Sequence, residues 1–117
     1  IYFTDQRYSK RETMELDHES VYRIDPDGKL TRLISTLIRP NGILVTSDSR
    51  TLYVADNPAT GDKPAALWAY DLDASGAVSR GRIAYQFTNA RGLDGMTLDT
   101  VGRIWAAGGE GKVAGAG

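Results

Sequence analysis

The sequence lacks cysteine entirely, has a single histidine and contains no long apolar run. The absence of cysteine excludes disulfides and cysteine-ligated zinc sites, and it leaves the redox compartment undetermined. A membrane-spanning helix needs about 18 or more consecutive apolar residues, and no such stretch is present. We therefore expect no membrane partner.

An excess of one charge is also absent. The 14 basic and 15 acidic residues give a net charge of −1 and are scattered along the chain. A nucleic-acid-binding domain normally carries a basic excess that is gathered in a patch. We therefore expect a soluble protein with no nucleic-acid partner. The chain begins at Ile1 in a strand-like segment, so we expect any signal peptide to lie upstream, and a cytoplasmic or exported location stays open.

What is present is a series of strand signals. Short runs of apolar, β-branched or aromatic residues alternate with turn residues, and no segment keeps a helical apolar period over three turns. The pattern predicts an all-β fold, with a loop or one helical turn over residues 12–18. The predicted strands are residues 1–5, 20–25, 29–35, 42–46, 51–55, 66–71, 82–87, 95–99 and 103–107.

The chain repeats itself in two registers. Asp5, Asp56 and Gly108 end similar apolar strands at spacings of 51 and 52 residues, and Asn41 and Asp94 precede glycine at a spacing of 53 residues. Each unit is four strands long, which is close to the span of a β-propeller blade of ~40–50 residues. A β-sandwich of similar strand number is the competing architecture, but a sandwich does not require this self-similarity.

The repeat divides one partial propeller domain, residues 1–117, into a little over two blades. With strands labelled A to D from axis to rim, residues 1–36 hold strands B to D of one blade. Residues 40–88 form one full blade, and residues 93–117 begin the next. Asp25-Pro26-Asp27-Gly28 and Asp73-Ala74-Ser75-Gly76 then become equivalent C-to-D hairpin turns.

Five motifs in this order resemble a known family. Each motif alone is weak, because Asn-Gly and Asp-Gly are common turn signals, but the ordered set is similar to the SMP-30/gluconolactonase/LRE-like family of six-bladed β-propeller lactonases. The resemblance covers nearly the whole chain and implies an internal fragment of such a propeller. The motifs span residues 2–5, 21–28, 39–43, 52–56 and 93–96.

The resemblance implies a metal site. Members of this family hold a divalent cation with an early Glu, an Asn, an Asp and an assisting Asn. Asn41 matches the first Asn and Asp94 matches the Asp, whereas the Glu and the assisting Asn would precede Ile1. Leu93 replaces the family's usual Pro, which changes the stiffness of the turn and keeps the ligand. Residues 1–117 alone are therefore expected to be inactive.

The residues themselves are consistent with such a site. Asn41 and Asp94 each begin an innermost strand of adjacent blades, so both are expected to point toward the axis. Their oxygens suit a hard cation, with Ca²⁺ preferred and Mg²⁺ or Zn²⁺ as alternatives. The competing interpretation is that Asn41-Gly42 and Asp94-Gly95 only turn the chain.

These features predict a metal-dependent hydrolase of a lactone or related ester. The cation would polarise the carbonyl, and Asp94 would serve as metal ligand and general base toward water; direct attack by Asp94 is an alternative. The partner would be a small-molecule lactone, such as a sugar-acid lactone. Two other functions stay open: a non-catalytic propeller that binds ligands or proteins, and an enzyme of the same fold that acts on a phosphotriester or a condensation substrate.

Three further residues are candidates for substrate binding. Asp5 and Asp56 end equivalent strands of successive blades, where they would line the substrate mouth, hold a structural cation or cap a turn. Arg7 follows Asp5 and would contact a sugar-like substrate.

Overall fold

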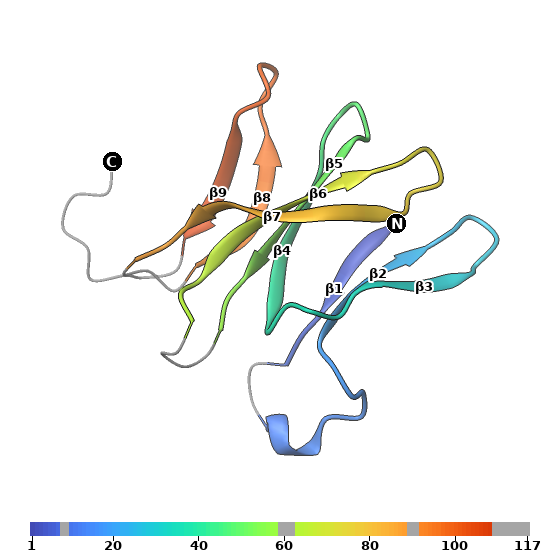
Figure 1. Ribbon diagram of the computed structural model, residues 1–117, viewed down its shortest axis with the longest axis vertical. Coiled ribbons are helices and arrows are strands. Elements are labelled where there is room, and N and C mark those ends of the chain that lie inside the picture. The colour runs from blue at the N-terminus through green and yellow to red at the C-terminus, as the bar shows by residue number, and fades with distance from the viewer. Residues whose placement is uncertain (8–9, 59–62, 89–91, 109–117) are drawn as a thin grey trace.

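The computed structural model describes residues 1–7, 10–58, 63–88 and 92–108. In this part of the chain, nine strands form three antiparallel sheets that fan out side by side (Figure 1). The first sheet contains β1 (Tyr2–Asp5), β2 (Ser20–Ile24) and β3 (Leu30–Ile34). The second contains β4 (Pro40–Val45), β5 (Thr51–Asp56), β6 (Ala66–Leu72) and β7 (Val78–Gln86), and the third contains β8 (Leu93–Leu98) and β9 (Ile104–Gly108).

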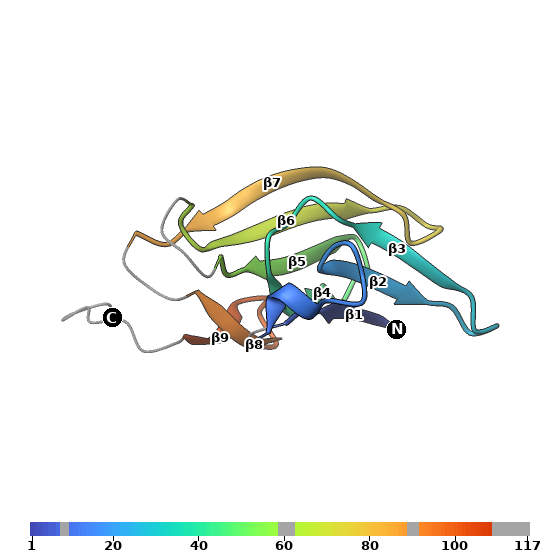
Figure 2. The same ribbon diagram turned by 90° about the horizontal axis from the view of Figure 1, so that it is seen from below.

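Within each sheet the strands follow chain order, as in a meander. Strand β4 lies between β1 on one side and β8 on the other (Figure 1). Seen from below, β1, β4 and β8 gather at one side of the molecule while β7 lies at the opposite side (Figure 2). The strands that carry the candidate site therefore converge, and the outer strands spread apart.

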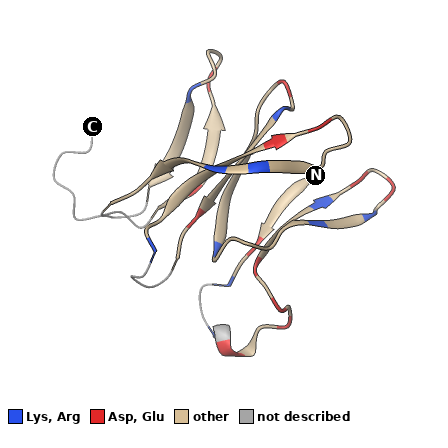
Figure 3. Ribbon diagram, viewed as in Figure 1, with Lys and Arg blue, Asp and Glu red and all other residues tan. Residues whose placement is uncertain are grey.

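The connection between β1 and β2 contains one turn of 3₁₀ helix, η1 (Arg11–Thr13). Within the described residues, no helix is long and apolar enough to cross a membrane. Acidic and basic residues are interspersed over all three sheets and their turns (Figure 3).

The apolar core lies between the first and second sheets. Val21 of β2 and Leu52 and Val54 of β5 are fully buried there, and each such side chain contributes roughly 1.5–3 kcal/mol when removed from water. Burial also raises the pKa of Tyr70 to about 12. The buried cluster consists of Val21, Ile34, Leu37, Leu52, Val54, Tyr70 and Leu72.

Two turns occupy equivalent places in the repeat. Residues 25–28 connect β2 to β3, and residues 73–76 connect β6 to β7. In both turns the last residue, Gly28 or Gly76, has a positive φ and donates its N–H to the carbonyl of the first. A positive φ is readily adopted by glycine. The predicted equivalence of these hairpin turns is confirmed.

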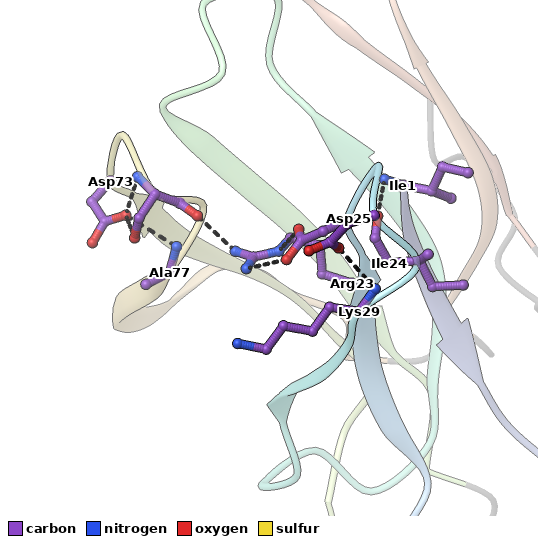
Figure 4. A network of polar contacts seen from close by, with 9 residues as sticks. Ile1, Arg23, Ile24, Asp25, Lys29, Asp73 and Ala77 are labelled. Atoms are coloured by element: carbon purple, nitrogen blue, oxygen red, sulfur yellow. Dashed lines mark hydrogen bonds and ion pairs between the residues drawn. The ribbon is translucent and has the colours of Figure 1, made fainter.

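Arg23 links the first sheet to the turn of the second. Its Nε lies 2.7 Å from Asp25 Oδ1, and its Nη1 donates a hydrogen bond of 2.9 Å to the carbonyl oxygen of Ser75 (Figure 4). The hydrogen bond with Asp25 raises the pKa of the Arg23 guanidinium above its usual value. The contact joins the hairpin ends of neighbouring sheets.

Three predicted strand starts, those of β4, β7 and β8, are wrong by two or more residues, for two reasons. β7 begins at Val78 instead of residue 82, because the Ser-Arg-Gly segment has no apolar alternation and pairs with β6 through irregular register. β4 begins at Pro40 and β8 at Leu93, each two residues before the predicted start. In these two strands the glycine-containing pairs lie inside the ladder instead of in the preceding turn.

Candidate functional site

The candidate site starts from two equivalent β-bulges. In β4, Pro40 pairs with Asp56 but the next paired residue is Ile43 with Val54, so Asn41 and Gly42 together face one residue of β5. In β8 the register shifts in the same way between Leu93 and Met96, which places Asp94 and Gly95 in the second bulge. A bulge bends its strand and redirects a side chain, which explains how a turn-forming pair fits into each strand.

The two bulges bring Asn41 and Asp94 into contact. Asn41 Nδ2 donates a hydrogen bond of 2.7 Å to Asp94 Oδ1. Asn41 is partly buried and Asp94 is exposed. The predicted proximity of the two side chains, at the same end of adjacent inner strands, is confirmed, while their roles as metal ligands stay a prediction.

Gly42 permits this close approach. A Cβ added at Gly42 would collide with the backbone carbonyl oxygen of Asp94. A residue with a side chain at position 42 would therefore force β8 away from β4. The glycine after Asn41 is thus explained by the packing of two blades, in addition to the local bulge.

Strand β1 and the residue that follows it also contact Asn41. Thr4 Oγ1 donates to the backbone oxygen of Asn41 at 2.7 Å, and Gln6 Nε2 donates to Asn41 Oδ1 at 3.0 Å. Elements of all three sheets therefore meet at Asn41. Sequence reasoning missed both Thr4 and Gln6.

Asn57 plays the corresponding part for β8. Its Nδ2 donates to the carbonyl of Leu93 at 2.8 Å, and its Oδ1 accepts from the N–H of Leu93 at 3.2 Å. The repeat contains a signal for both residues, because Gln6 follows Asp5 as Asn57 follows Asp56. In each case a carboxamide directly after a strand reaches the start of the next blade's inner strand.

Asp56 is a buried carboxylate that holds the chain leading into β4. Its Oδ1 accepts from the N–H of Arg39 at 2.6 Å, and both its oxygens lie 3.1 Å from the N–H of Ile38. Asp56 is 7% exposed. The carboxylate is thus engaged by backbone amides, and its contact with substrate stays a prediction.

Asp5 and Arg7 lie together in another place. They border a cavity of about 170 Å³ between the end of β1 and the connection to β2. The Arg7 N–H donates to Glu19 Oε1 at 3.1 Å, and Arg7 Nη1 donates to the carbonyl of Thr13 at 2.7 Å. The described residues that line the cavity are Asp5, Gln6, Arg7, Met14, Glu15, Leu16, His18 and Glu19. The structure therefore brings two of the three predicted substrate residues to one cavity, and Asp56 is not among its lining residues.

Gln6 lies between this cavity and the hydrogen-bonded pair Asn41 and Asp94. It lines the cavity and donates to Asn41. Its Oε1 is buried and has no hydrogen-bond partner among the described residues. A small molecule in the cavity would therefore lie one residue away from the Asn41–Asp94 pair.

The donor set fits a hard cation in its chemistry. Asn41 and Asp94 can offer an amide and a carboxylate oxygen, which are ligands of Ca²⁺ and Mg²⁺. Within residues 1–7, 10–58, 63–88 and 92–108, no three His, Cys, Asp or Glu side chains gather into a metal-binding group. The described part of the chain therefore supplies two candidate oxygen ligands at this site.

Antiparallel meander sheets that fan out from converging inner strands are typical of the blades of a β-propeller, which have four strands each. The second sheet has all four strands, and the first and third have three and two. The sequence matches the SMP-30/Gluconolactonase/LRE-like region over residues 1–115. The chain belongs to this family.

Several proteins of known name are similar to it. The gluconolactonase of Zymomonas mobilis subsp. mobilis is 29% identical over 119 residues, which cover 92% of this chain and 33% of that protein. The pentonolactonase XacC of Haloferax volcanii is 35% identical over 92 residues, or 78% of this chain and 30% of that protein. The chain thus spans about a third of the length of these relatives.

A solved structure shows the same fold. The gluconolactonase XC5397 of Xanthomonas campestris superposes with a TM-score of 0.74 at 32% identity, over 91% of this chain and 36% of that one. A luciferin-regenerating enzyme superposes with a TM-score of 0.62 at 27% identity, over 76% of this chain and 29% of that one. The predicted fold class, all-β and part of a six-bladed β-propeller, is confirmed.

Proposed function

We propose that the protein hydrolyses a lactone of the sugar-acid type, with a divalent cation, Ca²⁺ preferred, held by Asn41 and Asp94. The observation that carries the proposal is the 2.7 Å contact between these side chains, which come from equivalent bulges of adjacent blades. The names of the relatives support the substrate class, because they include a gluconolactonase and a pentonolactonase.

The bound cation would polarise the lactone carbonyl and stabilise the negative charge that develops on its oxygen. Asp94 accepts a proton from the attacking water, whose oxygen forms a bond to the carbonyl carbon. The bond between that carbon and the ring oxygen then breaks. Asp94 returns its proton to the ring oxygen, so the products are a hydroxyl group and a carboxylic acid. The exposure of Asp94 leaves room for water beside its carboxylate.

The cavity beside Gln6 supplies a place for the rest of the substrate. Asp5 and Arg7 border it, and a polyhydroxylated ring offers donors and acceptors to both a carboxylate and a guanidinium. We place the sugar hydroxyls on this side of the site. Asp56 would act at a distance, by fixing the backbone before Asn41.

The test is the release of acid from lactones by the full-length protein. After treatment with a chelator, the protein should not accelerate hydrolysis of an aldonolactone above its spontaneous rate, and added Ca²⁺ should restore the activity. Two variants are compared: Asp94→Ala at the site, and Asp27→Ala in an exposed hairpin turn as the control. Asp94→Ala should abolish the activity, and Asp27→Ala should leave it unchanged. A wild-type protein that binds lactones but never hydrolyses them would favour the non-catalytic binding module.

A further inference from the structure

The hydrogen bonds from Gln6 through Asn41 to Asp94 have a direction. Asp94 as a carboxylate can only accept, so Asn41 presents Nδ2 to it. That orientation leaves Asn41 Oδ1 facing Gln6, which presents Nε2. The negative charge of Asp94 therefore sets the orientation of both carboxamides.

A cation between Asn41 and Asp94 requires the hydrogen bond between Gln6 and Asn41 to run in the opposite direction. Both residues must then present oxygen, because an amide nitrogen does not bind a hard cation. Rotation of the Asn41 carboxamide turns Oδ1 toward the cation and Nδ2 toward Gln6. Gln6 must then accept a hydrogen bond, and its Oε1 is a buried oxygen that has no hydrogen-bond partner among the described residues.

We propose that Gln6 is a positioning residue that holds Asn41 in the orientation required for cation binding. This inference rests on the proposed function, since it needs a cation at Asn41 and Asp94. A carboxamide at position 6 suits the site both without and with a cation. Without a cation, its Nε2 donates to Asn41 Oδ1. With a cation bound, its Oε1 accepts from Asn41 Nδ2. Residues that orient a metal ligand typically change metal affinity by about 10–100-fold when they are removed.

The position of Gln6 supports this role. It follows β1 and borders the cavity, so its side chain reaches Asn41 from a different sheet. Asn57 holds the equivalent place in the next repeat and bonds the backbone of Leu93 instead of a side chain. The repeat therefore uses this position to fix the start of the neighbouring inner strand, and at Gln6 the partner is a candidate ligand.

The experiment is a calorimetric titration of the metal-free, full-length protein with Ca²⁺. Gln6→Met keeps the length of the side chain and removes both hydrogen bonds, so Ca²⁺ affinity should fall about tenfold. Gln6→Glu keeps an acceptor and should bind Ca²⁺ at least as tightly as the wild type. Gln86→Met, at an exposed position at the end of β7, is the matched control and should change nothing.

A double-mutant comparison separates positioning from packing. In an Asn41→Ala background, Gln6→Met should cause no further loss of affinity, because its effect passes through Asn41. If Gln6→Met does not fold, Gln6→Lys takes its place, since it offers donors only and should also weaken binding.

Three outcomes would overturn the proposal. Wild-type Ca²⁺ affinity in Gln6→Met would show that Gln6 does not position Asn41, and it would not contradict the proposed lactone hydrolysis. An equal loss in the Asn41→Ala background would show that Gln6 acts independently of Asn41. Lactone hydrolysis by a wild-type protein that binds no divalent cation would overturn both this role and the metal part of the proposed function.

Discussion

Asn41 and Asp94 lie 53 residues apart in the sequence, and their side chains are joined by a hydrogen bond of 2.7 Å. The contact exists because two bulges at equivalent places in the repeat turn both side chains toward each other. The backbone carbonyl of Asp94 lies so close to Gly42 that no Cβ fits between them. The candidate site therefore depends on the packing of two blades as much as on its two polar residues.

Gly42→Ala should disturb this packing. The added methyl group collides with the Asp94 carbonyl, and overpacking of this kind typically costs about 1–3 kcal/mol. We expect a lower free energy of unfolding in urea and weaker Ca²⁺ binding, because β8 must move away from β4. A Gly42→Ala protein with wild-type stability and wild-type Ca²⁺ affinity would show that the close approach is not required.

Asn41→Ala should lower lactone hydrolysis through loss of the cation. Removal of a direct ligand should reduce Ca²⁺ affinity by more than the roughly 10–100-fold that loss of a supporting residue costs. Excess Ca²⁺ should restore part of the activity, and Asn41→Asp should retain it because a carboxylate keeps an oxygen ligand. The measurement is the initial rate against Ca²⁺ concentration, and the same dependence in Asn41→Ala and wild type would contradict the assignment.

Asp56→Ala should destabilise the fold. The substitution leaves the N–H groups of Ile38 and Arg39 without their acceptor, at a cost of about 1–3 kcal/mol. Asp5→Ala removes the equivalent, exposed carboxylate and should change stability by less than about 0.5 kcal/mol. Urea denaturation of both variants is the test. If Asp56→Ala raises KM and leaves the unfolding free energy unchanged, Asp56 belongs to substrate binding instead.

The turn between β8 and β9 should weaken in acid. Hydrogen bonds from the N–H of Arg103 and from the side chain of Trp105 hold the pKa of Asp99 at about 2, below its ordinary value of 3.8. A carboxyl whose pKa is lower in the folded state stabilises the fold above its unfolded pKa. Its contribution is therefore complete above about pH 4 and is lost as the pH falls toward 2.

The matched variant for this prediction is Asp99→Asn, which stays neutral at every pH. The melting temperature of the wild type should exceed that of Asp99→Asn at pH 5 to 7, and the difference should shrink as the pH falls to 2. A difference in melting temperature that is independent of pH would contradict the lowered pKa of Asp99 as its cause.

Much of the fold follows from local sequence patterns. Alternating apolar runs identify the strands, and the repeat of about 52 residues distinguishes a propeller from a sandwich. The predicted starts of β4 and β8 were wrong because a bulge in each strand contains a turn-forming pair, Asn41-Gly42 or Asp94-Gly95. Standard turn chemistry assigns such pairs to loops, so the bulges could not be read from these residues alone.

The site could be predicted in part. The repeat aligns Asn41 with Asp94 and thereby predicts their proximity, because equivalent positions of adjacent blades are neighbours in space. Thr4 could not be found in this way, because it contacts Asn41 across a sheet boundary from a different position of the repeat. Gln6 has a signal in the repeat, since it follows Asp5 as Asn57 follows Asp56, but that signal does not identify Asn41 as its partner. The partner in a contact between nonequivalent positions depends on the packing of the blades, which the period of the sequence does not specify.

The most direct test of the account is the rate of lactone hydrolysis by Asp94→Ala in the folded, full-length protein, with Ca²⁺ in excess. The account predicts that kcat/KM falls by at least about 10²-fold, since the substitution removes a metal ligand and the general base together, and that added Ca²⁺ does not restore it. Circular dichroism should show an unchanged fold. Hydrolysis at the wild-type rate by this folded variant would contradict the assignment of the site.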